Sequence, residues 1–301
     1  IVAGNIFNVL TSLFQFKSQI PEHLKNKILT HAFYEAKKSG KVNAQALQKH
    51  IAMGEEKHLR LPLKKYHIVT TISLAQKVKV PVKMIDGVRI SITPDLPIKY
   101  LKARQEILKI ITSSEYDAHG LRYQYVVVTV SGKTKNEAVD IALDKLDFVR
   151  SLWNYYFNSA QPWRISFDEH KAVNRIKLGP YHSLHKPDGG LATEDWWYEK
   201  NYNEPSSSHI SKNKYDKALE YSNRALTKIK HLKYRNELEN YLVNYGRALD
   251  TDDLHSSFLK LWVALEQITG TTFQTKKTDR AARIYSNFKF SLEIVNYLRD
   301  F

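Results

Sequence analysis

Arginine and histidine recur in this sequence at spacings of six or seven residues. Histidine can transfer protons, and arginine can hold a phosphate and stabilise its growing negative charge. In a basic chain with 12 histidines, most such pairs arise by chance. The pairs are Arg60/His67, Arg164/His170, Arg175/His182 and Arg224/His231. Only the last lies on a predicted helix, where this spacing places both side chains on one face.

A second group of possible chemical residues is His182 and His185, followed by Asp188. These residue types suit a metal site or half of a two-histidine phosphoesterase site. They lie where a predicted strand runs into a glycine-rich loop, and the second histidine motif of such an enzyme is not evident. We therefore expect loop histidines that hydrogen-bond to the backbone.

Basic residues gather on the same predicted helix as Arg224. They are Lys214, Lys217, Arg224, Lys228, Lys230, Lys233 and Arg235, and a second group follows at Lys276, Lys277 and Arg280. Tyr215, Tyr221 and Tyr234 are interleaved with the first group. The pattern predicts an RNA backbone track with stacking platforms. The alternative is an amphipathic helix with ordinary exposed lysines and half-buried tyrosines.

Composition points in the same direction. The 301 residues carry a formal net charge of +15, which favours an anionic partner such as nucleic acid. The chain has no cysteine, so disulfides, thiol catalysis and cysteine-based zinc sites are excluded. No stretch is apolar enough for a membrane span, and no nucleotide-binding glycine motif is present. We expect a cytoplasmic protein without metal or cofactor.

The elements that position these residues differ along the chain. Residues 1–60 predict helices, with Asn43 capping one that starts near Ala44. Residues 66–74 and 78–93 predict a β-hairpin, with a turn signal at Asp86-Gly87. The pattern then predicts a helix over 98–113, a strand over 123–130, a helix over 136–157 and short strands over 164–167 and 173–178. Residues 1–186 are therefore predicted to form an α+β domain.

The rest of the chain predicts an all-α domain. Residues 187–213 have loop or linker composition. Helical patterns then continue, one capped by Asp250 or Thr251 and another starting near Thr278. The predicted core face of the capped helix is Leu254, Phe258, Leu261, Trp262, Leu265 and Ile268. We expect residues 214–301 to form an antiparallel helical bundle, truncated at its C-terminal end.

Two segments of this bundle resemble a known family. The first comprises residues 258–266, Phe-Leu-Lys-Leu-Trp-Val-Ala-Leu-Glu, and the second comprises residues 295–301, Val-Asn-Tyr-Leu-Arg-Asp-Phe. Both resemble HEPN domains, specifically the Apea-like branch of bacterial defence proteins. The resemblance implies a metal-independent endoribonuclease with an arginine–histidine motif, acting as a homodimer. Arg299 and Glu266 would be catalytic, with the histidine expected beyond Phe301. The motif arginine can instead be the residue that follows Phe301. Glu266 can instead be a structural partner of Arg280 or Arg283.

The resemblance also implies a biological role. The expected protein is a two-domain, abortive-infection type defence protein, in which the N-terminal α+β domain binds a phage-derived trigger and the HEPN-like bundle cuts RNA, possibly tRNA. The residues assigned to RNA binding are Arg224, Lys228, His231, Arg280 and Arg283. The alternative is a non-catalytic nucleic-acid-binding or scaffold module.

Overall fold

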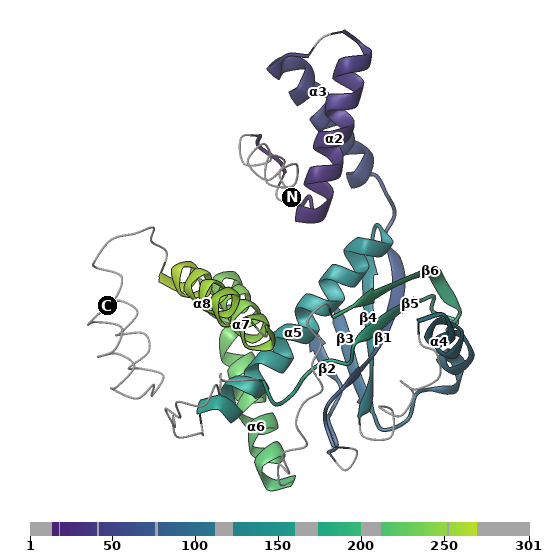
Figure 1. Cartoon of the computed structure of the whole chain (residues 1–301). Helices are drawn as coiled ribbons and strands as arrows, with labels where there is room; N and C mark the ends of the chain where they lie inside the picture. Colours follow the sequence, from purple (N-terminus) through teal and green to yellow (C-terminus); the bar gives the residue numbers. More distant parts are fainter. Residues whose placement is uncertain are drawn as a thin grey trace. The chain divides into compact units, whose positions relative to one another are not determined.

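The computed structural model describes residues 14–17, 19–40, 42–75, 78–111, 123–159, 174–199, 212–251 and 253–269, which contain seven helices and six strands (Figure 1). The chain divides into two compact units. The first comprises residues 1–64 and 131–138, and the second comprises residues 65–130 and 139–301.

The first unit is built around a pair of packed helices, α2 (Glu22–Lys38) and α3 (Ala44–Leu59). Asn43 caps α3 as predicted, because its Oδ1 accepts a hydrogen bond from the Ala46 backbone N–H at 2.8 Å. Apolar side chains from the two helices form a core that includes Leu29, Ala32 and Ile51, all fully buried. This unit confirms the expected helices between residues 21 and 60.

The second unit contains a six-stranded sheet in the order β2-β3-β4-β1-β5-β6. Its strands are β1 (Lys64–Ile72), β2 (Lys83–Ile85), β3 (Val88–Thr93), β4 (Gln124–Gly132), β5 (Tyr181–His185) and β6 (Leu191–Tyr198). The pairs β2–β3, β3–β4, β1–β5 and β5–β6 are antiparallel. Figure 1 shows helix α4 (Ile98–Ile111) on one face of the sheet and helix α5 (Lys135–Ser159) on the other.

The pairing of the first strands differs from the predicted hairpin. Asp86 and Gly87, with φ of 49° and 79°, form the predicted turn, but it joins β2 to β3 within residues 78–93. The predicted hairpin between 66–74 and 78–93 is wrong, because β4 lies between β3 and β1. Val126 and Val128, which share one face of β4, are fully buried, as expected for a strand inside the sheet.

The predicted strand over 173–178 is also wrong. The backbone N–H and C=O of Ile176 bond to the Asn154 side-chain amide at 2.9 and 2.8 Å. These groups are therefore satisfied without a strand ladder, and only Leu178 forms an isolated bridge, to Ile72. The chain joins the sheet later, at β5. The other short strand, expected over 164–167, lies outside the described residues.

Residues 187–213 were expected to be a loop, yet they contain β6. The stretch Pro187-Asp-Gly-Gly190 is a tight turn between β5 and β6. Gly189 has φ of 100°, and the Lys186 N–H bonds to the Gly190 carbonyl at 2.8 Å. Turn and linker share the same residue types, so composition did not separate them.

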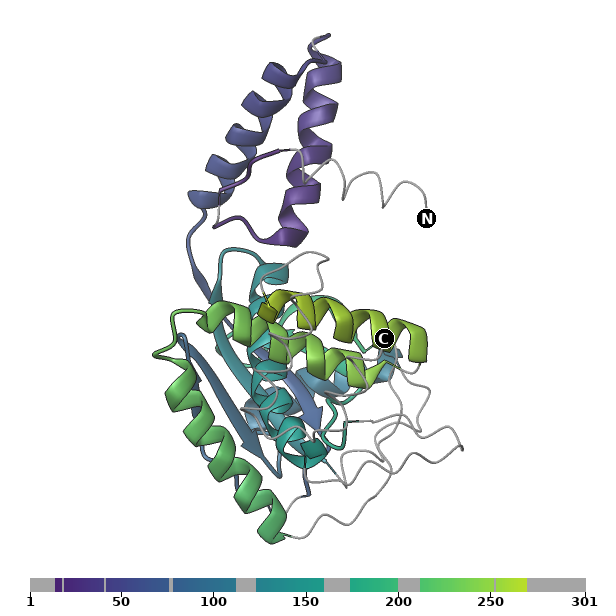
Figure 2. The ribbon, with the colours of Figure 1, turned by 90° about the vertical axis from the view of Figure 1, so that its left-hand side faces the viewer.

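Three helices follow, α6 (Lys212–Ile229), α7 (Arg235–Asp250) and α8 (Leu254–Thr269), and Figures 1 and 2 show α7 and α8 side by side. The helices are as predicted, but the division into units does not follow the expected boundary between 186 and 214. The reason is α5, whose Trp153 Nε1–H bonds to Ser222 Oγ of α6 at 2.9 Å. The expected helix beginning near Thr278 lies outside the described residues.

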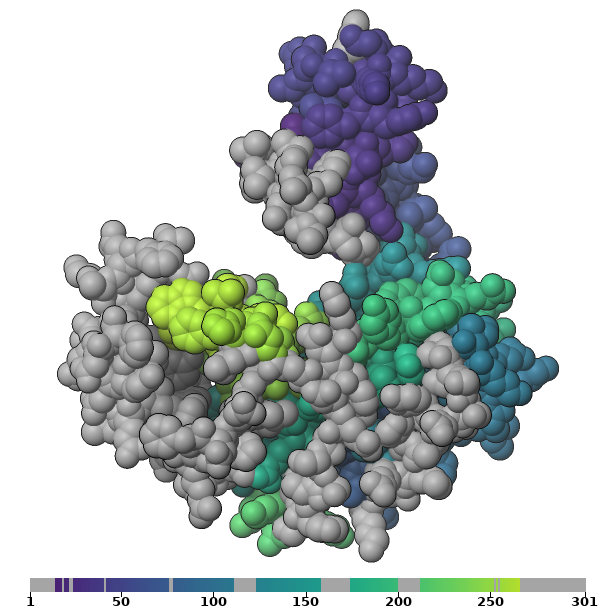
Figure 3. Space-filling view, viewed as in Figure 1, coloured from purple at the N-terminus to yellow at the C-terminus, as the bar shows by residue number. Residues whose placement is uncertain are grey.

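The start and packing face of α8 also differ from expectation. Asp253 caps the helix, because its Oδ2 accepts from the Ser256 N–H at 2.7 Å. Asp250 is already engaged by Arg150. Small residues, Ser257 and Ala264, are buried against the rest of the unit, whereas Phe258 of the predicted core face is 58% exposed. Accordingly, α8 contributes a broad stretch of the surface in Figure 3.

No described helix has the length and apolar character needed to cross a lipid bilayer.

Candidate nucleic-acid interface

Helix α6 has one buried face and one charged face. The buried residues are Tyr215, Ala218, Leu219, Ser222, Leu226 and Ile229. They recur at helical spacing, as the sequence predicted, and pack the helix onto the unit. Figure 2 shows α6 on the outside of this unit. Its opposite face is therefore available to a partner.

A row of exposed side chains runs along this free face, and we call it the α6 stripe. Its members are Lys214, Lys217, Tyr221, Arg224 and Lys228, which follow one another at alternating spacings of three and four residues. Such spacing aligns side chains along a helix, and the row is about 21 Å long at 1.5 Å per residue. The stripe therefore presents four cations and one aromatic ring in a line.

The charges of the α6 stripe are weakly engaged within the protein. Arg224 forms an ion pair with Glu220, one turn earlier, and the two side chains are 70% and 60% exposed. Exposed pairs of this kind contribute only about 0–1 kcal/mol, so a phosphate can displace Glu220. His231 lies beyond the end of α6 in an exposed turn, where its backbone N–H donates to the Lys228 carbonyl at 3.2 Å.

The three interleaved tyrosines divide between the two faces. Tyr215 is 6% exposed and its ring meets Phe157 edge-on, at 5.5 Å between centroids. Tyr221 and Tyr234 are 62% and 56% exposed. Thus Tyr215 follows the expectation of an ordinary amphipathic helix, whereas Tyr221 has the exposure that a stacking platform needs.

A first ionic network joins the start of α7 to α5 and to the turn between β2 and β3. Lys145 of α5 bonds to Asp86 at 2.6 Å and to Glu239 at 2.7 Å, and Arg235 contacts the same two carboxylates. Burial alone would raise the pKa of Asp86, but hydrogen bonds from Lys145 and Arg235 hold it below its usual value. In addition, Lys83 Nζ of β2 donates to Asn223 Oδ1 of α6.

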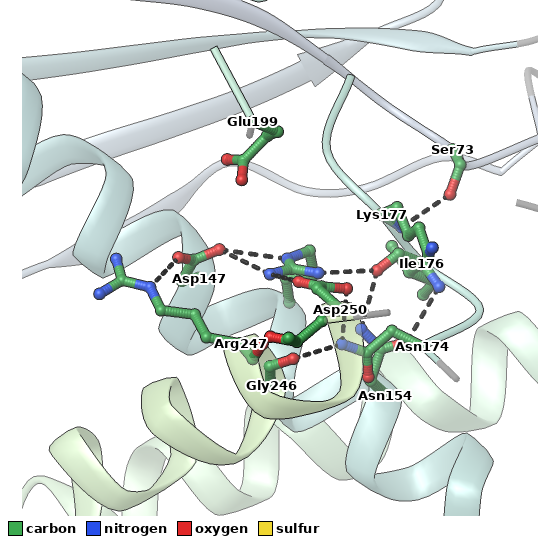
Figure 4. Close-up of polar contacts among 12 residues, drawn as sticks. Ser73, Asp147, Asn154, Asn174, Ile176, Lys177, Glu199, Gly246, Arg247 and Asp250 are labelled. Carbon is green, nitrogen blue, oxygen red and sulfur yellow. Dashed lines mark hydrogen bonds and ion pairs between the residues drawn. The ribbon is translucent and has the colours of Figure 1, made fainter. Parts of the chain in front are cut away.

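A second network fixes α7 to α5 (Figure 4). Arg150 bonds to Asp147 at 2.8 Å and to Asp250 at 2.6 Å, and Arg247 bonds to Asp147 at 2.8 Å. Asn174 donates to the Gly246 carbonyl at 2.6 Å. Burial would raise the pKa of Asp147, but Arg150 and Arg247 lower it, so the carboxylate stays charged. These paired charges are structural, because they hold α7 on α5, the helix that also contacts α6.

A small cavity of about 260 Å³ lies between α5 and α7. Its floor is apolar, with Ile141, Phe148 and Val243, and its rim carries the pairs Lys145–Glu239 and Asp144–Arg247. Because these charges already satisfy one another, the cavity offers little to an anionic ligand.

The histidines of β5 do not form one site. His182 bonds to Thr70 Oγ1 at 2.7 Å and to Glu199 at 3.1 Å. His185 instead bonds to Ser183 Oγ at 2.8 Å and to the Gly189 carbonyl at 2.9 Å. Ser183 follows His182 directly and so points to the opposite face of the strand, the face that it shares with His185. Among the described residues, no group of three His, Cys, Asp or Glu side chains is placed to hold a metal.

The sequence did not reveal a buried polar cluster beneath α4. His67 lies opposite His185 in the sheet, and its Nδ1 is 2.5 Å from the Tyr100 hydroxyl. Arg104 donates to Ser183 Oγ at 2.8 Å. Burial, with Lys99 and Lys65 nearby, lowers the pKa of His67 to about 4. The cluster is closed to solvent and serves to dock α4, and only the tertiary pairing of β1 with β5 brings it together.

No family model, curated protein or solved structure matches the chain. Its function is therefore inferred from its own residues.

The predicted site residues have different outcomes. Arg224, Lys228 and His231 are exposed at or just beyond the C-terminal half of α6. Glu266 lies on α8, where only its backbone is described, and Arg280, Arg283 and Arg299 lie outside the described residues. Both the RNA-binding assignment on α6 and the catalytic assignment of Glu266 and Arg299 stay predictions, and the first falls on side chains that the structure describes.

Proposed function

We propose that the protein binds RNA through the α6 stripe, chiefly by contacts to phosphate. The observation that carries the proposal is the row of exposed cations, Lys214, Lys217, Arg224 and Lys228, on one face of a braced helix. Basic side chains that neutralise phosphates release condensed counterions, which supplies sequence-independent affinity. The formal net charge of +15 adds attraction at longer range.

The test is a fourfold substitution of these cations by glutamine. Because all four are exposed, the free energy of unfolding should change little. Fluorescence polarisation with a labelled RNA oligonucleotide should show lower affinity and a shallower dependence of log Kd on log salt.

The matched control carries the same change of net charge elsewhere. Lys37, Lys38, Lys49 and Lys57 are exposed on α2 and α3 and can also be replaced by glutamine. If both fourfold variants lose affinity equally, bulk charge rather than the α6 stripe governs binding. Equal affinity for DNA of the same sequence would identify the partner as nucleic acid in general.

We also propose RNA cleavage, which rests on the resemblance to HEPN domains. Its support is that residues 258–266 lie on a helix, α8, packed along α7. The expected catalytic residues are Arg299 and Glu266, with Arg280 and Arg283 holding RNA. The associated defence role, tRNA substrate, homodimer and phage-derived trigger are proposals of the same origin.

Cleavage is tested by incubating the full-length protein with total RNA in chelator. Metal-independent cleavage that is lost in Arg299→Ala and Glu266→Gln, with helix content retained, supports the proposal. Intact RNA at high protein concentration, together with retained binding, leaves a non-catalytic RNA-binding module.

A further inference from the structure

Tyr221 occupies the centre of the α6 stripe. Its neighbours one turn before and one turn after are Lys217 and Arg224, and all three are exposed. The ring is 62% exposed, so it contributes little to the core. A large aromatic side chain thus faces solvent between two cations.

The ring of Tyr221 is also held from behind. It packs against Tyr156 of α5, with 4.9 Å between ring centroids and 37° between planes. Tyr156 in turn meets Phe157 edge-on at 5.9 Å, and Phe157 meets the buried Tyr215. This series of rings fixes Tyr221 against the unit and leaves the remainder of its surface exposed.

A cation, a ring and a cation in one line match a nucleic-acid strand whose bases are accessible. Lysine and arginine neutralise successive phosphates, while an aromatic face stacks on a base. In a duplex the bases are already stacked and paired, so only the phosphates could be used. The length of the stripe, about 21 Å, suits about four nucleotides, the lower end of known single-strand sites.

We propose that the α6 stripe takes single-stranded RNA, with one base stacked on Tyr221 and with Tyr156 as a positioning residue behind it. This inference rests on the proposed function, because it names the form of RNA that the stripe selects. Tyr221 is then the residue that determines specificity for single strands.

The experiment compares a labelled single-stranded 12-nucleotide RNA with the same sequence annealed to its complement. The unmodified protein should bind the single strand more tightly. Tyr221→Ala should weaken single-strand binding by about 5- to 150-fold, the range for loss of one base–aromatic stack, and leave duplex binding unchanged. Tyr221→Phe should restore single-strand affinity, because it retains the ring. The salt dependence should be the same in all three proteins, since no phosphate contact is removed.

Tyr156 has a separate readout. Tyr156→Ala should weaken single-strand binding less than Tyr221→Ala does, because the platform remains but is no longer braced. Tyr156→Phe should rescue it, and duplex affinity should be unchanged in both variants. A merely structural role would lower both affinities together and would not separate them. Tyr234→Ala removes another exposed tyrosine outside the stripe and should leave the preference unaltered.

The outcomes separate the inference from the proposed function. Equal binding of single strand and duplex, unaffected by Tyr221→Ala, overturns single-strand selection while RNA binding stands. An equal loss in Tyr234→Ala overturns the special role of Tyr221. Absence of binding to either RNA overturns both proposals.

Discussion

Arg224 and Arg150 are both paired with carboxylates, yet they serve opposite purposes. The Arg224 side chain is 70% exposed and has one partner, Glu220, while Arg150 is 3% exposed and is held by Asp147 and Asp250. A charge that is buried must keep its partners, whereas an exposed charge can exchange them for a ligand. The comparison separates the paired, structural charges of α5 and α7 from the exposed charges of the α6 stripe, which can exchange their partners.

The largest expected effect comes from Arg150→Met. It removes the buried cation, so that Asp250 loses its cationic partner and Asp147 keeps Arg247, which should cost about 3–5 kcal/mol of unfolding free energy. Urea unfolding measures the loss. Arg224→Met is the control and should stay within about 0.5 kcal/mol. Similar losses in the two variants would remove the distinction between the networks.

A smaller effect concerns pH. Burial holds His67 neutral, with a pKa of about 4 against 6.5 in the unfolded chain. The unfolded state therefore binds more protons between these values, so stability should fall by about 2–3 kcal/mol as pH drops from about 6.5 to 4. Urea unfolding across this range should show a flatter profile for His67→Gln. A profile for His67→Gln as steep as that of the unmodified protein would contradict the assignment.

Asp86 tests the network that joins the sheet to α7. Asp86→Ala removes the contacts to Lys145 and Arg235 and places alanine at a φ of 49°, so we expect a loss of about 1–2 kcal/mol. Asp86→Asn should cost less, because asparagine tolerates this conformation. Thermal unfolding distinguishes them. If both variants lose the same stability, the loss of the negative charge of Asp86 alone accounts for the effect.

The smallest effect on stability is expected at Glu220, which lies beside the α6 stripe. Glu220→Gln frees Arg224 from its only acidic neighbour on the helix face and should tighten RNA binding by up to about fivefold. The melting temperature should hardly change. Weaker binding would mean that Glu220 positions Arg224 for RNA rather than competing with it.

Local patterns in the sequence predicted local structure well. The cap at Asn43, the turn at Asp86-Gly87 and the buried face of α6 each depend on residues a few positions apart. The same periodicity contains the α6 stripe, because the positions opposite a buried face must be exposed. The exposure of Arg224 and Lys228 could therefore be predicted from the sequence.

Long-range pairings were not predictable in this way. Asn154 satisfies the backbone of Ile176, and Tyr156 of α5 packs behind Tyr221 of α6. The residues next to Asn154 and Tyr156 in the sequence do not indicate these contacts, because the contacts form only after α5 has folded onto the rest of the chain. The turn at 187–190 shows a third limit, because its residue types suit a linker equally well.

Helix α5 has a practical consequence for anyone who cuts the chain into pieces. Its Trp153, Arg150 and Asp147 hold α6 and α7, while its own start follows directly from the sheet through β4. A recombinant fragment that begins at residue 212 would lose these anchors and leave Asp250 without its cation. The helices that carry the α6 stripe are therefore not a portable module, and a fusion or domain exchange must include the sheet as well.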